Sequence, residues 1–377
     1  YRTITEGNGD VIIARFSDAA YFVDEDMERD LESYLSDLEL LTFQEDLGSM
    51  RDKTDRIRSM VDALAGEMGI DADQRNVIQR AAELCKADLA TKMVVEMTSL
   101  EGIMGYYYAL HSGENERVAT AIREHYLPRS AGGPAPDTKP GLVLGIADRL
   151  DSLVGLFAAG LEPTGSKDPF AQRRAALGLV ENLISWDMDF NLRAGIEVAA
   201  TEMPLEVSDG VREDILAFIR DRLHNHLRDE GYAYHLVDAV VAAQGHNPAG
   251  AARSVASLQE WVQRDDWEEI LDTYARCVRI TRDLQETFPV DDELLSEDEE
   301  RELYQAVQKT EDKEREPGDV DDFFQAFLPL IPPITRFFDH VLVMAEDDRL
   351  RENRLGLLQR VASLAEGVVD LSRLEGF

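Results

Sequence analysis

Three residues of the types that hold divalent metals, Asp88, His125 and Asp148, stand far apart in the first half of the chain. Carboxylate and imidazole groups are the ligands of many hydrolytic metal sites. The set is short of imidazole, because the residue before Asp88 is Ala87 and the helical segment before it contains no histidine. Lys86 adds a cation that opposes a bound metal. The pattern therefore predicts a helical site without a catalytic metal. Ordinary polar residues with local hydrogen bonds would fit it as well.

A second group of residues suits phosphate binding. Gly165 permits a tight turn, and Asp168 before Pro169 predicts an N-cap followed by the first residue of a helix. Arg173 and Arg174 then lie about one turn into that helix. An exposed helix N-terminus with two arginines would receive a phosphate. The alternative is a capped helix whose arginines pair with nearby acidic residues.

A third group lies near the end of the chain, where Arg351, Asn353 and Arg354 follow the acidic turn 346–348. Arginine contacts phosphates and base edges in pairs of hydrogen bonds, and asparagine reads base edges. An aromatic such as Phe337 can stack on an unpaired base. In the alternative interpretation Phe337 belongs to the core and the arginines neutralise the acidic turn.

Helices must position most of these groups. Residues 52–68 repeat apolar side chains at spacings of three and four and stop at Gly69, which predicts a helix with a glycine after its end. Residues 141–157 predict another helix. The segments 128–140 and 162–169 are rich in glycine and proline and predict loops.

The remaining pattern is helical with one exception. The apolar stripe of residues 85–97 predicts one continuous helix, and the acidic segment 286–322 predicts a partly helical connector. Residues 11–13 (VII) are the only β signal, separated from any partner strand. The predicted fold class is therefore all-α and multi-domain, with one short orphan β segment near the N-terminus.

Composition limits the function. The 377 residues have room for two or three domains, and the formal net charge is −36, which opposes any general attraction for nucleic acid. The acidic residues are unevenly spread: segment 286–322 has 16 acidic and 4 basic residues, whereas 121–180 has 6 and 7, and 323–377 has 8 and 6. Any contact with nucleic acid must therefore be local.

Cysteine usage and hydropathy indicate the compartment. Cys85 and Cys277 lack the close spacing of metal ligands, which suits a reducing environment. No apolar run approaches the ~20 residues that span a bilayer. We expect a cytoplasmic protein without a membrane partner.

The order of Lys86, Ala87, Asp88, His125 and Asp148 resembles the HD superfamily of helical phosphohydrolases. In that superfamily a histidine, a His-Asp dyad and a distant aspartate hold a divalent metal. Ala87 stands at the dyad histidine, so the resemblance implies a degenerate HD-like domain. An HD-type metal-dependent phosphohydrolase remains an alternative.

Three stretches together carry a more specific resemblance: 84–105 (LCKADLATKMVVEMTSLEGIMG), 163–178 (PTGSKDPFAQRRAALG) and 337–358 (FFDHVLVMAEDDRLRENRLGLL). They resemble the C-terminal half of the β subunit of the bacterial two-subunit glycyl-tRNA synthetase. That resemblance implies a degenerate HD-like domain that cradles tRNA, followed by the helical anticodon-binding domain shared with arginyl-tRNA synthetase.

The resemblance implies four regions. They are a remnant of a preceding domain with a connecting helix (1–47), the HD-like helical domain (48–205), a helical linker (206–255) and the anticodon-binding domain (256–377).

It also implies which residues bind tRNA, and no catalytic residue. The anticodon candidates are Arg276, Arg279, Phe337, Arg351, Asn353 and Arg354. The candidates in the HD-like region are Lys86, His125, Arg129, Lys167, Arg173 and Arg174. Cys277 stands where the family usually has an arginine, and Arg279 is the nearest substitute.

The function implied is the tRNA-binding part of a glycine–tRNA ligase that recognises tRNA-Gly. The α subunit, or a fused α part, would hold ATP and Mg²⁺, with no cofactor in this part and no DNA partner. A helical protein-interaction scaffold is the other alternative.

Overall fold

The computed structural model describes residues 2–377, with side chains described from residue 11 onward. The chain divides into two compact units, Tyr1–Arg222 and Leu223–Phe377. In the described part of the chain there are seventeen α-helices and one two-stranded sheet, which confirms the all-α class. The division falls inside the predicted linker 206–255, and the domain bounds themselves stay a prediction.

Unit 1 is a helical domain. Its helices are α1 (Arg2–Asp26), α2 (Met50–Glu67), α3 (Ala72–Leu84), α4 (Lys92–Glu96), α5 (Ile103–His111), α6 (Glu116–Glu124), α7 (Lys139–Ala158), α8 (Gln172–Ser185), α9 (Leu192–Thr201) and α10 (Asp209–Asp229), which runs past the boundary between the units. Short 3-10 helices lie at Leu31–Leu40, Ala87–Ala90 and Thr98–Leu100. The strands β1 (Thr42–Gln44) and β2 (Gly48–Ser49) pair antiparallel.

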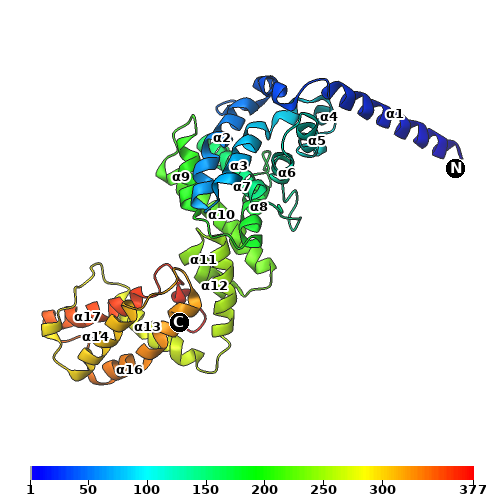
Figure 1. Ribbon diagram of the computed structural model, residues 1–377. Helices are drawn as coiled ribbons and strands as arrows, with labels where there is room; N and C mark the ends of the chain where they lie inside the picture. The colour runs from blue at the N-terminus through cyan, green and yellow to red at the C-terminus, as the bar shows by residue number, and fades with distance from the viewer. Residues whose placement is uncertain (1) are drawn as a thin grey trace. The chain divides into compact units, whose positions relative to one another are not determined.

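Helix α7 is the centre of unit 1 and contacts α2, α3, α6, α8 and α9 (Figure 1). Its sequence is apolar on every face, and a helix of that kind is stable only when it is surrounded. Thr138 accepts a hydrogen bond from the backbone N–H of Gly141 and so caps its start. Of the polar residues that α7 carries, Arg149 and Asp151 are buried in the domain centre, and Asp148 and Ser152 are partly exposed.

Helix α2 shows how local sequence sets an element. Ser49 and Asp52 form a capping box at its start, which satisfies backbone donors at the N-terminus. Gly69 has φ of 64° just past its end, a conformation that favours glycine. The predicted stop at Gly69 is confirmed.

The predicted β segment at residues 11–13 is wrong. These residues lie within α1, where Val11 is 62% exposed and Ile13 is 66% exposed. A three-residue strand needs a partner for its backbone groups, and the two strands among the described residues pair with each other. A helix satisfies its own backbone hydrogen bonds, so the β-branched run adopts that structure.

The continuous helix predicted over residues 85–97 is also wrong. Helix α3 ends at Leu84, a 3-10 helix follows, and α4 begins at Lys92. Carboxylates capture the backbone donors around the breaks: Asp26 accepts from the N–H groups of Lys92 and Met93, at 2.8 and 2.9 Å. The apolar spacing is real, but long-range side-chain contacts divide the segment.

Unit 2 is a second helical domain. Its helices are α11 (Tyr234–Gln244), α12 (Pro248–Trp261), α13 (Trp267–Thr281), α14 (Asp298–Glu311), α15 (Val320–Phe327), α16 (Ile331–His340) and α17 (Asp348–Ser363), with 3-10 helices at Asp292–Leu294, Leu328–Leu330 and Leu371–Arg373. Phe323, Phe324, Phe327 and Phe337 are fully buried and form an aromatic core. Tyr274 packs edge-on against Phe323 and Phe327.

None of the helices described, in either unit, has the length and apolar character needed to cross a bilayer.

Candidate functional site

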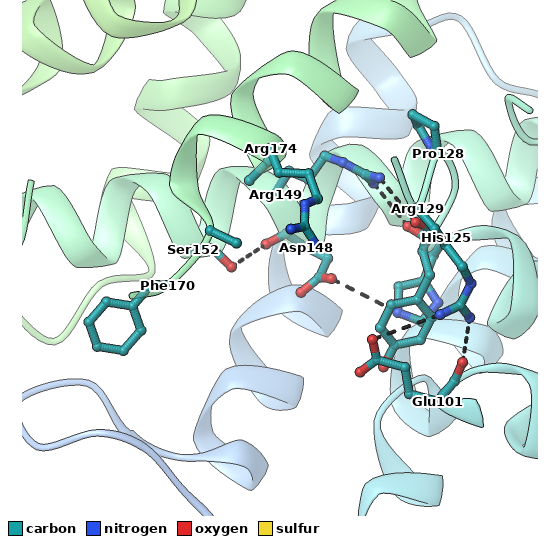
Figure 2. Close-up of a pocket in the computed structure, with 12 residues that line it drawn as sticks. Glu101, His125, Pro128, Arg129, Asp148, Arg149, Ser152, Phe170 and Arg174 are labelled. Atoms are coloured by element: carbon teal, nitrogen blue, oxygen red, sulfur yellow. Dashed lines mark hydrogen bonds and ion pairs between the residues drawn. The ribbon is translucent and has the colours of Figure 1, made fainter. Parts of the chain in front are cut away.

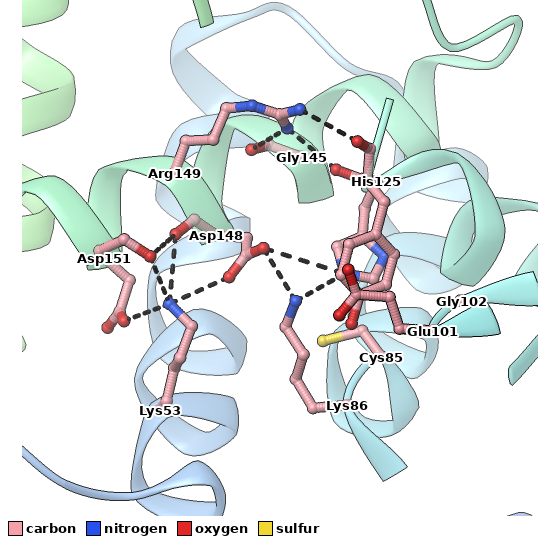
Figure 3. A network of polar contacts seen from close by, with 12 residues as sticks. Lys53, Cys85, Lys86, Glu101, Gly102, His125, Gly145, Asp148, Arg149 and Asp151 are labelled. Atoms are coloured by element: carbon pink, nitrogen blue, oxygen red, sulfur yellow. Dashed lines mark hydrogen bonds and ion pairs between the residues drawn. The ribbon is translucent and has the colours of Figure 1, made fainter. Parts of the chain in front are cut away.

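A cluster of charged side chains lies around α7 in unit 1 (Figure 3). We call it the Lys86 cluster, and it consists of Lys53, Lys86, His125, Asp148 and Asp151. Lys53 comes from α2, Lys86 follows α3, and His125 follows the last residue of α6. Asp148 and Asp151 lie about one turn apart on α7. Four segments far apart in sequence therefore meet at one buried point.

The ammonium group of Lys86 bridges two of the residues predicted as metal ligands. Its Nζ lies 2.9 Å from His125 Nε2 and 2.8 Å from Asp148 Oδ2. His125 Nδ1 lies 2.6 Å from the carbonyl oxygen of Ile122. Because a carbonyl only accepts, Nδ1 carries the proton and Nε2 offers its lone pair to Lys86. The lysine thus occupies the position in which a cation would meet these two groups.

The other members of the cluster complete the pairing. Lys53 Nζ lies 3.0 Å from Asp148 Oδ1 and 2.7 Å from Asp151 Oδ2. Arg56 Nε lies 2.6 Å from Asp151 Oδ1. Positive and negative groups therefore alternate from Arg56 through Asp151, Lys53 and Asp148 to Lys86, and each of these charges has at least one partner of opposite sign.

Burial and pairing set the protonation states. Burial alone would raise the pKa of Asp148, but Lys53 and Lys86 outweigh it and hold that pKa well below its usual range. Burial lowers the pKa of His125 well below its usual value, and the charge of Lys86 lowers it further. Asp148 is therefore ionised and His125 neutral near pH 7.

Asp88, the third predicted metal ligand, has a different role. It lies in the 3-10 helix Ala87–Ala90, and its Oδ2 accepts hydrogen bonds from the backbone N–H groups of Gly102 and Gly105, at 2.6 and 3.0 Å. A Cβ on Gly105 would lie 2.8 Å from Ile122 Cγ2, so the close approach requires glycine. Burial raises the pKa of Asp88 to about 6. Asp88 anchors the start of α5.

The structure thus joins two of the three residues predicted as metal ligands, His125 and Asp148, through a lysine, and gives the third, Asp88, backbone partners. In the described part of the chain, no group of three or more His, Cys, Asp or Glu side chains is placed to hold a metal ion. The absence of a catalytic metal stays a prediction, and the position of Lys86 gives it a physical reason.

A cavity of about 340 Å³ opens beside the Lys86 cluster (Figure 2). Its walls are Glu101, His125, Tyr126, Pro128, Arg129, Asp148, Arg149, Ser152, Phe170, Ala171, Arg174 and Ala175. Arg149 is buried and donates to the carbonyl oxygens of His125, Gly145 and Leu127. Arg129 donates to the carbonyl oxygen of Glu101. Arg174 is exposed on α8 and extends toward Asp148.

The predicted helix start at Pro169 is wrong by three residues. Helix α8 begins at Gln172 after Ala171, whose φ is 55°. Asp168 still caps it: its two carboxylate oxygens accept from the N–H groups of Gln172 and Arg173, at 2.8 and 2.9 Å. The helix N-terminus is therefore occupied by the chain's own carboxylate and is not free to receive a phosphate.

The two predicted arginines of α8 differ in what they contact. Arg173 Nη2 donates to the carbonyl oxygen of Gly165 at 2.8 Å and so fastens the preceding loop. Arg174 faces the cavity. Lys167 is exposed on the loop. Of the remaining candidates in this region, Lys86 and His125 are buried in the cluster, so Arg129, Lys167 and Arg174 are the ones placed to meet a ligand.

Three of the anticodon candidates in unit 2 are buried. Phe337 belongs to the aromatic core. Asn353 Oδ1 accepts from the N–H of Asp291 at 2.6 Å, and its Nδ2 donates to the carbonyl oxygen of Asp291 at 3.1 Å. Arg354 is 7% exposed, with Nε 2.5 Å from Glu300 Oε1. Asn353 and Arg354 hold the acidic segment against α17, and a base-reading role for the three buried residues stays a prediction.

The other anticodon candidates reach the surface. Arg276 lies over the ring of Phe338, 4.3 Å from its centre. Arg279 Nη1 lies 3.4 Å from Asp272 Oδ1, and Arg351 pairs with Asp348. They come from α13 and α17, which contact each other. Cys277 lies between Arg276 and Arg279 in the sequence and is buried, and this burial raises the pKa of its thiol to about 12.

The comparisons with known proteins agree with this organisation. A family model described as "Glycyl-tRNA synthetase beta subunit" matches residues 1–242, and one described as "DALR anticodon binding domain" matches residues 270–371. The chain belongs to the glycyl-tRNA synthetase beta subunit family. The resemblance inferred from the three sequence stretches is confirmed.

Individual members of this family match nearly the whole chain. The glycine–tRNA ligase beta subunit of Moorella thermoacetica is 40% identical over 98% of this chain and 55% of its own length. That of Chromohalobacter salexigens is 39% identical over 99% and 54%. The glycine–tRNA ligase, chloroplastic/mitochondrial 2, of Arabidopsis thaliana is 38% identical over 99% of this chain and 35% of its own length. The chain spans about half the length of the bacterial relatives.

Sequence reasoning missed part of this beta-subunit site. Lys53 and Asp151 complete the Lys86 cluster, Arg56 pairs with Asp151 beside it, and Phe170 lines the cavity. One signal was available: Asp148 and Asp151 are spaced three residues apart on an otherwise apolar helix, and buried carboxylates require cationic partners. The identity of those partners, nearly 100 residues earlier on α2, could not be read from spacing.

Proposed function

We propose that this chain is the tRNA-binding part of a glycine–tRNA ligase. The observation that carries the proposal is the succession, in one chain, of the beta-subunit region and an anticodon-binding domain. The enzyme's reaction joins glycine to tRNA-Gly at the expense of ATP. The chain would contribute as a beta subunit, and its catalytic partner would be an α subunit or a fused α part.

The site geometry supports binding rather than chemistry. In the Lys86 cluster the lone pair of His125 Nε2 and the charge of Asp148 are both committed to lysines. Neither group is free to activate water. We therefore place ATP and Mg²⁺ with the α part and assign this chain no cofactor. The same arrangement disfavours a metal-dependent phosphohydrolase.

Unit 2 supplies the surface for the anticodon. Arg276 and Arg279 lie on α13 and Arg351 on α17, two helices that contact each other, and none of the three side chains is buried. Guanidinium groups donate to phosphates and to the acceptor edges of bases. Because the whole chain is at −36, recognition depends on such local cations rather than on long-range attraction.

A binding assay tests the proposal. The full chain is titrated with tRNA-Gly and with a non-cognate tRNA at one fixed salt concentration, since affinities for RNA depend on salt. We expect tighter binding of tRNA-Gly. No binding of either tRNA would refute the proposal and favour a protein-interaction scaffold. We further propose a cytoplasmic location, to be checked by fractionation of the source cells.

A further inference from the structure

The family matches assign no ligand to the cavity beside the Lys86 cluster. It lies where α7, α8 and the loop after α6 come together (Figure 2). One part of its wall is charged, with Arg129, Asp148 and Arg174. Phe170, whose ring is partly exposed, stands on one side of the charged residues, and Pro128 stands on the other side (Figure 2). Charged groups with an aromatic ring to one side, in about 340 Å³, match the size and character of small-ligand sites.

The wall carries more positive than negative charge. Three guanidinium groups face two carboxylates, those of Glu101 and Asp148. Asp148 is already paired with Lys53 and Lys86 behind the wall, at 3.0 and 2.8 Å, so its charge is more than compensated. A local excess of positive charge, in a chain whose formal net charge is −36, favours the binding of an anion at this cavity.

Two of the arginines have hydrogen-bond donors to spare. Arg149 is not one of them, because both of its Nη groups donate hydrogen bonds to backbone carbonyl oxygens. Arg129 uses Nη2 on a backbone carbonyl, and its Nη1 lies 3.8 Å from Glu101 Oε1, beyond hydrogen-bond distance. Arg174 makes no hydrogen bond or ion pair with any residue in the described part of the chain. Arg129 and Arg174 are therefore the groups that an incoming anion would meet.

We propose that this cavity binds a nucleotide, with its phosphate on Arg129 and Arg174 and its base against Phe170, and leaves it unhydrolysed. Guanidinium groups recognise phosphate with charge-assisted hydrogen bonds, and aromatic rings stack on bases. The phosphate can belong to an RNA or to a free mononucleotide. The RNA source rests on the proposed function, and the mononucleotide source does not.

The ligand stays intact because the neighbouring polar groups are occupied. Hydrolysis of a phosphate ester needs a water made nucleophilic by a base or a metal ion. His125 Nε2 accepts from Lys86, and both carboxylate oxygens of Asp148 face lysines. Asp148 Oδ1 has no hydrogen-bond donor, but Lys53 and Lys86 hold the pKa of this carboxylate well below its usual range, so it is a weak base toward water.

The test uses the full chain and four probes: adenosine monophosphate, adenosine, and an eight-residue RNA with either a 5′-phosphate or a 5′-hydroxyl. Binding is measured by calorimetry for the wild type, Arg174→Ala and Phe170→Ala. The matched control is Arg193→Ala, which removes another exposed arginine, paired with Glu213 outside the cavity. Circular dichroism of each variant checks that it folds.

We expect Arg174→Ala to weaken at least one phosphate-bearing probe about tenfold, as for the loss of a charge-assisted hydrogen bond. Arg193→Ala should leave it unchanged, and adenosine should bind more weakly than its monophosphate. Weakening of the mononucleotide assigns the site to free nucleotides, and weakening of the RNA alone assigns it to RNA. Equal binding by Arg174→Ala and Arg193→Ala for every probe overturns the proposal. Release of inorganic phosphate from a probe would overturn the proposal that the bound nucleotide is left unhydrolysed.

A parallel titration with tRNA-Gly separates this inference from the proposed function. If the chain binds tRNA-Gly but Arg174→Ala and Arg193→Ala behave alike on all probes, the cavity proposal fails and the tRNA-binding function stands. If tRNA-Gly does not bind, the proposed function fails, and adenosine monophosphate alone decides the cavity.

Discussion

Replacing Lys86 by methionine tests whether one ammonium group holds the centre of unit 1. Methionine keeps an unbranched stem of similar length and removes the charge between His125 Nε2 and Asp148 Oδ2. Lys86 is 3% exposed, so water does not replace the lost contacts. Breaking a buried ion pair by removing one partner costs roughly 3–5 kcal/mol. Asp148 keeps Lys53 at 3.0 Å, which places the expected loss near the lower end, at about 3 kcal/mol.

The assay is urea unfolding followed by circular dichroism, with Lys92→Met as the matched control. Lys92 is half-exposed and pairs with Glu25, and an exposed pair contributes only about 0–1 kcal/mol. Because the chain has two units, the transition of unit 1 is fitted separately. A loss for Lys86→Met no larger than that for Lys92→Met would refute the idea that Lys86 replaces a cation at this site.

Three further outcomes are expected. Asp88 has a folded pKa of about 6, above its unfolded value of 3.8, so the folded state holds its proton more tightly and loses stability as pH rises through that window. From pH 5 to 7.5 the wild type should lose about 1.4 kcal/mol relative to Asp88→Asn in urea unfolding, and a constant difference would contradict this. Arg354→Ala should lower the unfolding free energy by about 3 kcal/mol. Arg351→Ala should change the unfolding free energy by no more than ~0.5 kcal/mol, and it should weaken the binding of tRNA-Gly about tenfold and that of an anticodon-swapped tRNA much less. Equal losses of affinity for both tRNAs would remove the base-reading role of Arg351. The chain alone should not catalyse glycine-dependent exchange of pyrophosphate into ATP, and detectable exchange would place the adenylation site here.

The sequence predicted the helices well where short-range signals set them. The stop at Gly69 and the loop before α7 follow from glycine, proline and capping residues within a few positions. Residues 11–13 misled because β propensity matters only when a partner strand exists. The start of α8 was misplaced because Asp168 lies four residues before the first residue of the helix, whereas an N-cap residue usually lies directly before it.

The candidate site was harder to predict, because burial depends on partners distant in sequence. Arg351 and Arg354 are three residues apart on one helix and have the same chemistry. Arg354 is buried because Glu300, 54 residues earlier, meets its guanidinium group. Asp88, His125 and Asp148 were predicted as one set with Lys86 as an opposing cation. Spacing could not show that Lys86 bridges His125 and Asp148 while Asp88 accepts from the backbone at the start of α5.

The alternating charges of the Lys86 cluster also limit how unit 1 can evolve. Asp148 and Asp151 each pair with two cations, and Lys53 pairs with both carboxylates. Removing Asp148 therefore leaves Lys86 without a carboxylate partner in the interior, whereas removing Lys86 leaves Asp148 with Lys53 alone. Changes of this kind are tolerated in compensating pairs, with coupling energies of roughly 0.5–3 kcal/mol between contacting sites. We expect sequence changes at these positions to conserve the net charge of the cluster, so that the loss of a lysine is accompanied by the loss of an aspartate.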